Sequence, residues 1–178
     1  RPEIKFEKKL PEKFLNNEVV IITGAGGSIG SKISEELCSL KIKNLILLDN
    51  SEFNLYALHT QLEKTTIINK KKIIPILGSI LDEEKLKMIF KKWKPTIIFH
   101  SAAYKHVPIV EHNVVEGLEN NVFGTLNLVK VSKQFKVKKF VLISTDKAVR
   151  PTNIMGASKR VSEIILQAYN SVSKTTIF

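Results

Sequence analysis

The chain has 178 residues, of which 43% are hydrophobic and 25% charged, and its 28 basic and 17 acidic side chains give a formal net charge of +11. This composition is too apolar for a disordered chain and fits one globular domain. A single cysteine, Cys38, excludes an internal disulfide and indicates a reducing compartment. No apolar run approaches the roughly 18 residues of a membrane span and no signal peptide opens the chain, so these residues are expected to be soluble.

The high positive charge raises the alternative of a nucleic-acid or membrane surface. Only Arg1, Arg150 and Arg160 are arginine, although arginine binds phosphates and base edges better than lysine does. The lysines are dispersed, with no aromatic residues interleaved. We therefore interpret them as a solvated surface and expect no nucleic-acid partner.

The elements follow an alternating order along the chain. Residues 1–17 are polar and contain two prolines, which predicts a lead-in arm before a domain over residues 18–178. Buried apolar runs then alternate with segments of helical spacing, which predicts an α/β fold. Strands are expected at about 19–22, 45–48, 73–77, 96–100 and 140–144, and the later helices at about 82–92, 110–134 and 156–170.

These strands are expected to form a Rossmann-like, doubly wound parallel sheet in the order 3-2-1-4-5-6. Pro75 lies inside the third run, where it removes a hydrogen-bond donor, so this strand is predicted at a sheet edge. The chain stops within an apolar stretch, residues 175–178, which we interpret as the start of the sixth strand. We accordingly expect a truncated cofactor domain, with its C-terminal substrate domain missing.

A glycine-rich loop follows the first strand directly. Such a loop needs glycine for its tight turn and for close approach to a pyrophosphate, which the next helix binds with its free N–H groups. Because the loop stands between a buried strand and an amphipathic helix, it predicts a dinucleotide site. The loop residues of this predicted site are Gly24, Gly26, Gly27, Ser28, Ile29 and Gly30.

Asp49 closes the second strand about twenty residues after the loop, where an acidic residue can accept both ribose hydroxyls of the adenosine. Its charge would repel a 2′-phosphate, and no Arg or Lys follows it directly, so NAD is favoured over NADP. We place Asn50 and Ser51 in the same site. The alternative is a purely structural turn, with Asp49 as the N-cap of the next helix.

Taken together, the motifs resemble the extended short-chain dehydrogenase/reductase superfamily that acts on nucleotide sugars. More narrowly, they are similar to the long, membrane-anchored bacterial UDP-N-acetylglucosamine 4,6-dehydratases of polysaccharide biosynthesis. The resemblance runs from about Glu18 to the end. The segments that carry it are Thr23–Gly30, Gly78–Asp82, His100–Pro108, Asn121–Thr125 and Ser144–Lys159.

The resemblance implies a NAD-dependent dehydration in which the sugar C4 is oxidised, the C5 proton is removed, the C6 hydroxyl leaves and the hydride returns to C6. It implies Asp146 as the acid, Lys147 as the base and Lys159 as the residue that binds the nicotinamide ribose. The alternative for Asp146 and Lys147 is a surface ion pair at a strand end.

One departure is that Met155 stands where the superfamily usually has the tyrosine of Tyr-x-x-x-Lys. A thioether cannot carry a proton, and the methionine form is typical of the long dehydratases. Our hypothesis is that Thr145 and a water, polarised by Lys159, replace the phenol. The alternative for Met155 is core packing.

Other segments support the same site. Ser79 and Ile80 are expected at the adenine, Ala102, Ala103 and Tyr104 beside the cofactor, and Lys105 and His106 toward the sugar. Asn121 is expected to be a buried amide that ties strands together. The four histidines lack a convincing ligand spacing, so no metal is expected.

Three functions remain open at this stage. The first is a nucleotide-sugar 4,6-dehydratase with a UDP-sugar substrate. The second is a 4-epimerase on the same fold, which normally depends on the missing tyrosine. The third is a cofactor-binding module without turnover. From the resemblance we also expect a homo-oligomer, formed through the helices near 111–134 and 156–170, and a cytoplasmic domain of an inner-membrane protein.

Overall fold

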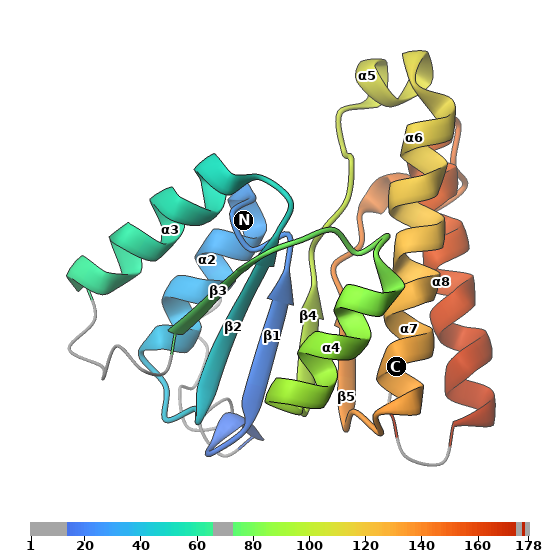
Figure 1. The fold of residues 1–178 in the computed structure, drawn as a ribbon. Coiled ribbons are helices and arrows are strands. Elements are labelled where there is room, and N and C mark those ends of the chain that lie inside the picture. The colour runs from blue at the N-terminus through green and yellow to red at the C-terminus, as the bar shows by residue number, and fades with distance from the viewer. Residues whose placement is uncertain (1–13, 66–72, 174–175, 177–178) are drawn as a thin grey trace, which may run out of the picture.

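A computed structural model describes residues 14–65, 73–173 and 176 of the chain, and its centre is a five-stranded parallel sheet. The strand order is β3-β2-β1-β4-β5, and every neighbouring pair is parallel (Figure 1). The predicted doubly wound order is confirmed for these five strands. The position predicted for a sixth lies largely outside the described residues. The strands are β1 (Val19–Thr23), β2 (Asn44–Asp49), β3 (Ile73–Leu77), β4 (Ile97–His100) and β5 (Lys139–Leu142).

Helices cover both faces of this sheet. Helices α2 and α3 pack on one face, and α4, α7 and α8 on the other (Figure 1). The helical elements are α2 (Ser28–Cys38), α3 (Glu52–Thr65), α4 (Glu83–Trp93), α5 (Val107–His112), α6 (Val114–Leu118), the π-helix η2 (Glu119–Phe123), α7 (Gly124–Gln134), the 3₁₀-helix η3 (Asp146–Ala148) and α8 (Ile154–Val172).

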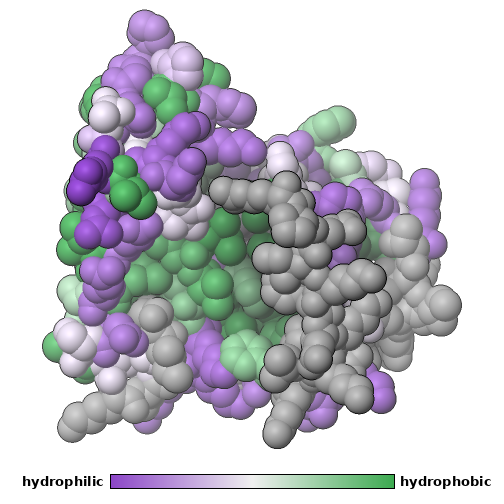
Figure 2. All heavy atoms as spheres, turned by 180° about the vertical axis from the view of Figure 1, so that it is seen from behind, coloured by the Kyte–Doolittle hydropathy of each residue, from purple (hydrophilic) through white to green (hydrophobic). Residues whose placement is uncertain are grey.

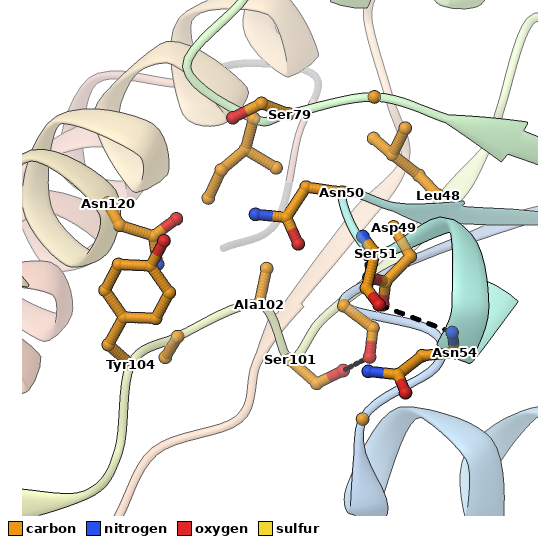
Figure 3. Close-up of a pocket in the computed structure, with 15 residues that line it drawn as sticks. Leu48, Asp49, Asn50, Ser51, Asn54, Ser79, Ser101, Ala102, Tyr104 and Asn120 are labelled. Atoms are coloured by element: carbon orange, nitrogen blue, oxygen red, sulfur yellow. Dashed lines mark hydrogen bonds between the residues drawn. The ribbon is translucent and has the colours of Figure 1, made fainter.

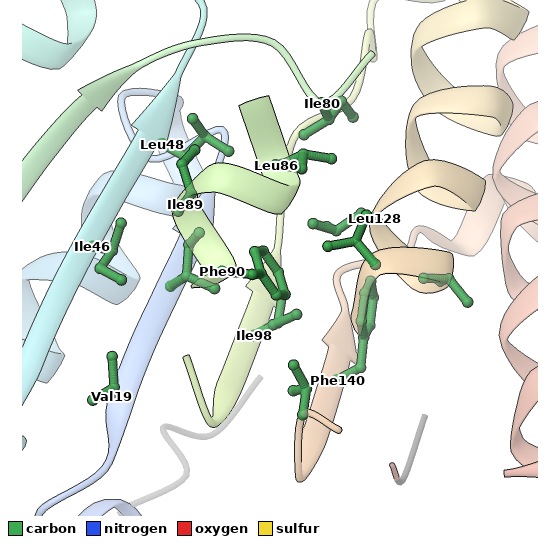
Figure 4. Packing of buried hydrophobic residues seen from close by; sticks show 14 of the residues in the cluster. Val19, Ile46, Leu48, Ile80, Leu86, Ile89, Phe90, Ile98, Leu128 and Phe140 are labelled. Carbon is green, nitrogen blue, oxygen red and sulfur yellow. The ribbon is translucent and has the colours of Figure 1, made fainter. Parts of the chain in front are cut away.

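Each strand contributes side chains to two separate hydrophobic cores, one on each face of the sheet, because successive side chains of a strand point to opposite sides. Ile21 and Ile98 pack under α4 and α7, whereas Val20 and Ile22 pack under α2 and α3. Phe90 of α4 is fully buried in the first core, as Figure 4 shows. Burying a side chain of this kind contributes about 1.5–3 kcal/mol, which fixes α4 on the sheet.

The prediction that Pro75 lies on an edge strand is confirmed. Strand β3 stands at the end of the strand order, and Pro75 is exposed. The residue without an N–H donor therefore lies on a strand that pairs with one neighbour alone, β2, within the described sheet.

The helical region predicted for residues 110–134 is confirmed except at Asn113. It consists of α5, then α6, η2 and α7, which follow one another directly. At Asn113 the backbone leaves the helical region (φ −133°, ψ 62°), while its side chain donates to the Ile109 carbonyl at 2.8 Å. Asparagine side chains compete for backbone groups in this way, which explains the break.

The described end of the predicted lead-in arm packs on the domain. Leu15 is 4% exposed and belongs to the core under α2 and α3. The Lys139 ammonium lies 3.4 Å from the centre of the Phe14 ring. Residues 1–13 lie outside the described part, so the domain boundary at residue 18 stays a prediction.

Hydrophobic residues gather in a hollow on the reverse face of the molecule (Figure 2). By strand alternation Phe99 and Val141 point to the face that carries α2 and α3, and both are only half-buried.

Among the described helices, none has the length and hydropathy needed to cross a bilayer.

Candidate active site

The glycine loop brings β1 into α2 through a tight turn. Gly24 adopts φ +66°, a conformation that favours glycine, and the Gly27 amide donates to its carbonyl at 3.1 Å. A Cβ on Gly30 would lie 2.1 Å from that same carbonyl oxygen. In the described part of the chain no side chain caps α2 at Gly27, so the first N–H groups of this helix remain available to an anion.

Asp49 is 6% exposed and braces this loop. Its two carboxylate oxygens accept from the Gly26 amide and from the Ser51 amide, each at 2.8 Å. Ser51 Oγ in turn accepts from the Asn54 amide at 3.3 Å, so the capping contact of α3 comes from Ser51 rather than from Asp49. The alternative of Asp49 as an N-cap is therefore not what the structure shows.

A cleft opens between the glycine loop and the loops that follow β2, β3 and β4. We call it the loop cleft. Tyr104 and Asn120 lie on one side of it, and Asp49, Ser51 and Asn54 on the other (Figure 3). The lining residues are Gly24, Gly27, Leu48, Asp49, Asn50, Ser51, Asn54, Gly78, Ser79, Ile80, Ser101, Ala102, Ala103, Tyr104 and Asn120.

A second cleft, which we call the α8 cleft, lies beside the first. Ser101, Ala103 and Tyr104 line both, so the two share a wall made by the segment after β4. The residues lining the α8 cleft are Ile29, Ser101, Ala103, Tyr104, Lys105, Ile143, Ser144, Thr145, Lys147, Met155 and Lys159.

Lys159 is the buried cation of the α8 cleft. It is 5% exposed, and its Nζ donates to the Ile143 carbonyl at 2.7 Å. Burial lowers the pKa of Lys159 to about 8, and the nearby Glu163 carboxylate acts against this lowering. Its spacing of four residues from Met155 places both side chains on the cleft side of α8.

The segment after β5 presents Thr145 and Lys147 to the α8 cleft. Thr145 Oγ1 accepts from the Lys147 amide at 3.3 Å and contacts the Asp146 carboxylate at 3.0 Å. Asp146 is exposed and is not among the cleft-lining residues. Thr145, Lys147, Met155 and Lys159 are thus brought together, while Asp146 stays at the edge.

Gly156 allows this segment to approach α8. A Cβ there would lie 2.3 Å from the Lys147 carbonyl oxygen. The Asn153 side chain accepts from the Gly156 amide at 2.8 Å and caps the helix. The backbone of Lys147 therefore rests directly on the first turn of α8.

The predicted cofactor residues divide into three groups. Most of them line the loop cleft, and Ile29 and Lys159 line the α8 cleft. Gly26, Ser28 and Gly30 shape the loop without lining either cleft. His106 is the residue just before α5, and it lines a neighbouring hollow with Lys105. Lys105 Nζ also donates to Ser28 Oγ at 3.3 Å.

Sequence reasoning missed several lining residues. Asn54 lies five residues after Asp49 on the first turn of α3, so a helical projection from Ser51 could have found it. Asn120 enters the loop cleft from the π-helix η2, for which the sequence carries no clear signal. The missed residues are Leu48, Asn54, Gly78, Ser101, Asn120, Ile143 and Ser144.

Asn121 is buried, as expected, but it does not tie strands together. Its side chain accepts from the Tyr104 amide at 2.8 Å and donates to the Tyr104 carbonyl at 2.9 Å and to Ser158 Oγ at 3.0 Å. It therefore holds the shared wall of the two clefts against α8. The expectation of a link between strands is wrong because η2 packs against α8.

His100 is fully buried and is hydrogen-bonded at both ring nitrogens. Thr125 Oγ1 donates to the Asn121 carbonyl at 2.6 Å, so it accepts from His100 Nε2 at 2.9 Å. The other nitrogen, Nδ1, then accepts from Thr23 Oγ1 at 2.6 Å. Both nitrogens are thereby engaged, and no group of three His, Cys, Asp or Glu side chains gathers as a metal site within the described ranges.

Burial lowers the pKa of His100 from 6.5 to about 3. Below pH 6.5 His100 binds a proton in the unfolded chain but stays neutral in the folded protein. The contribution of His100 to the free energy of unfolding is therefore fully present above pH 6.5 and decreases as the pH falls toward 3. His100→Gln keeps a donor toward Thr125 but has no titrating group. We expect it to remove up to about 1.4 kcal/mol per pH unit from the slope of the free energy of unfolding against pH. Urea denaturation at several pH values between 3 and 6.5 measures this slope.

The matched control is His112→Gln, because His112 is exposed at the end of α5. It should leave the pH dependence of stability as in the unmodified protein. An unchanged slope in His100→Gln would show that the buried imidazole does not titrate in this way.

The sheet order, the glycine loop and the adjoining clefts define a Rossmann-like domain of the short-chain dehydrogenase/reductase type. A family model described as "Polysaccharide biosynthesis protein" matches residues 20–178. The chain belongs to this family.

Three relatives illustrate its neighbourhood. The chain is 37% identical to the "Capsular polysaccharide biosynthesis protein CapD" of Staphylococcus aureus over 100% of this chain and 30% of that protein. It is 39% identical to the "Uncharacterized membrane protein MJ1061" of Methanocaldococcus jannaschii over 84% of this chain and 43% of that protein. It is 30% identical to the "UDP-N-acetylglucosamine 4,6-dehydratase (inverting)" of Campylobacter jejuni over 89% of this chain and 45% of that protein. The chain thus spans less than half the length of these relatives.

Solved structures agree with this placement. Pen from Bacillus thuringiensis matches with a TM-score of 0.83 and 30% identity, over 92% of this chain and 50% of that one. The complex of Thermus thermophilus UDP-glucose 4-epimerase with NAD matches with a TM-score of 0.69 and 25% identity, over 86% and 51%.

Proposed function

We propose that this chain is the cofactor-binding part of a NAD-dependent nucleotide-sugar 4,6-dehydratase that converts UDP-N-acetylglucosamine for polysaccharide biosynthesis. The observation that carries the proposal is the wall shared by the two clefts. On one side of Ser101, Ala103 and Tyr104 lies a dinucleotide-type loop, and on the other lie Thr145 and Lys147. A cofactor in the first cleft would therefore adjoin proton-transfer groups in the second.

The residues of the loop cleft fit NAD. The uncapped start of α2 suits a pyrophosphate, and Gly24 and Gly30 leave room for the backbone turn. The Asp49 carboxylate has about four acceptor sites, of which two amides occupy two, so acceptors remain for ribose hydroxyls. The chemistry that bound NAD would supply is the acceptance of a hydride from the sugar C4 and its later return to C6.

The residues of the α8 cleft fit the proton transfers. Lys147 would take the C5 proton, which becomes acidic once C4 is a ketone, and Asp146 would protonate the C6 hydroxyl as it leaves as water. Lys147 lines the cleft, and Asp146, its neighbour at the edge, would complete the site when the sugar is bound. Lys159 would orient the nicotinamide ribose.

Removal of the C4 hydroxyl proton is assigned to Thr145 with a water. Met155 is 2% exposed and occupies the position of the usual phenol. Thr145 and Lys159 line the same cleft, and the Lys159 pKa of about 8 lets that ammonium polarise a water near neutral pH.

A 4-epimerase is the second candidate, supported by the likeness to the Thermus enzyme. It is disfavoured because Met155 cannot act as its proton carrier. A binding module without turnover is the third candidate.

The assembly and the setting of the whole protein are proposals as well. Val161, Ile164 and Val172 are exposed along α8, which supports a homo-oligomer formed through that helix. The name of the Methanocaldococcus relative supports membrane attachment of the whole protein. We propose, from the family resemblance, that this domain lies on the cytoplasmic side.

Product analysis tests the proposal. Protein expressed from its complete reading frame is incubated with NAD and UDP-N-acetylglucosamine, and the sugar is identified by proton NMR. A 4-keto-6-deoxy sugar supports the dehydratase. Inversion at C4 alone supports the epimerase, and an unchanged sugar with NAD bound supports the module.

Asp49→Asn tests the cofactor assignment. It removes the charge and keeps the shape, so we expect NAD to bind about 10-fold more weakly and the preference over NADP to shrink, since a charged hydrogen bond contributes about 1.5–3 kcal/mol. Calorimetric titration with both cofactors measures this. Asp82→Ala is the control, because Asp82 caps α4 and lies outside the clefts. An unchanged preference in Asp49→Asn would remove Asp49 from this role.

A further inference from the structure

Glu163 holds the segment that follows β5. Ser144 Oγ donates to Glu163 Oε1 at 2.5 Å, and Arg160 Nη1 donates to Glu163 Oε2 at 2.9 Å. These hydrogen bonds keep the pKa of the Glu163 carboxyl below its usual value, the Ser144 hydroxyl being the largest cause. Both carboxylate oxygens are thus engaged, one by the segment and one by α8 itself.

Helix α8 contacts this segment at three successive levels. The Lys147 carbonyl lies close against Gly156. Lys159 donates a hydrogen bond to the Ile143 carbonyl, and Glu163 accepts one from the Ser144 hydroxyl. The last two contacts fix consecutive residues immediately before Thr145. Loss of the Glu163 contact would remove the hydrogen bond that joins the Ser144 side chain to α8.

The direction of the Ser144 hydrogen bond also matters for the cleft. Ser144 lines the α8 cleft, and its only hydroxyl hydrogen is given to Glu163. A serine hydroxyl has one donor and two acceptor sites, so Ser144 offers acceptors alone to whatever enters the cleft.

We propose that Glu163 is a positioning residue: it orients Ser144, and through it Thr145 and Lys147, and it places a carboxylate one helical turn from Lys159 on α8. The activity readout of this proposal rests on the proposed function. The second readout, a lysine titration, does not.

The surroundings of Lys159 set the expected direction of that titration. Lys159 interacts electrostatically with Glu163 on α8 and with His100 on β4, and Tyr104, Lys105 and Lys147 line the same cleft. Glu163 raises the pKa of Lys159 against the lowering by burial. Glu163→Gln should therefore lower this pKa further, whereas Ser144→Ala should leave it.

The activity test uses Glu163→Leu, Ser144→Ala and the double variant in protein from the complete reading frame, because leucine, unlike glutamine, leaves no acceptor for the Ser144 hydroxyl. We expect kcat for dehydration of UDP-N-acetylglucosamine to fall about 10- to 100-fold in each single variant, with the NAD affinity unchanged, as for a misplaced catalytic group. The double variant should lose no more than the worse single variant, because both break the same hydrogen bond. Gln167→Ala, one turn further along α8 and exposed, is the control.

The titration follows the labelled lysine side chains by NMR, with Lys159 assigned through Lys159→Arg. A midpoint near pH 8 that moves down in Glu163→Gln and not in Ser144→Ala supports the proposal even if the unmodified protein does not turn over the sugar. An unmoved midpoint in Glu163→Gln would overturn it. So would a variant whose thermal stability and NAD affinity fall together with kcat, because Glu163 would then act on the fold alone.

Discussion

Gly30→Ala is expected to abolish NAD binding and to destabilise the domain by about 3 kcal/mol, the upper part of the range for overpacking. The added Cβ would stand 2.1 Å from the Gly24 carbonyl oxygen and 2.9 Å from the backbone of Ala25. These are backbone atoms of the loop itself, so no side-chain movement relieves the clash. Denaturation with urea and titration with NAD measure the two effects.

Gly27→Ala is the matched control in the same loop. Its backbone is extended (φ −71°, ψ 166°), and among the described residues the added Cβ would meet only the Gly24 carbonyl oxygen, at 3.2 Å. We expect its stability to stay within about 1 kcal/mol of the unmodified protein. A Gly30→Ala protein as stable as Gly27→Ala would contradict the close packing of α2 against the loop.

Lys147→Ala should lower the rate of C5 proton exchange about 100- to 10,000-fold, the usual contribution of a positioned acid or base. Lys147 lines the α8 cleft but not the loop cleft, so NAD should bind with unchanged affinity. Loss of exchange with retained binding would separate proton transfer from cofactor recognition. The exchange is followed by NMR of the sugar in deuterated water.

Lys91→Ala controls for the loss of one positive charge, because Lys91 is exposed on α4 and lines neither cleft. Its exchange rate should match that of the unmodified protein. Full exchange in Lys147→Ala would remove Lys147 as the base and would direct attention to Lys105, the other exposed lysine of the α8 cleft.

The sheet was predictable because its signals are local. Each buried strand is a short apolar run, the glycine loop follows β1 directly, and Pro75 marks an edge by removing a single donor. The order of the strands follows from the doubly wound pattern. Asp49 was also predictable, since its distance from the loop is characteristic of the motif.

The rest depends on contacts between distant segments. Nothing in the spacing of residues 110–134 indicates the break at Asn113 or the π-helix that turns Asn120 into the loop cleft. The hydrogen bond from Ser144 to Glu163 joins residues 19 apart in the chain. It depends on the path of the intervening loop, which cannot be predicted from the sequence. Asn121 was recognised as buried, but its partners follow from how η2 packs on α8.

The most direct test of the central claim, that the two adjoining clefts serve one dehydration, is the fate of the sugar C5 hydrogen. Protein from the complete reading frame is incubated with NAD and UDP-N-acetylglucosamine in deuterated water, and the product is examined by NMR and mass spectrometry. We expect a 4-keto-6-deoxy sugar with deuterium at C5 and with the original C4 hydrogen transferred to C6. A sugar that binds but keeps its C5 hydrogen, or that is only inverted at C4, would contradict it.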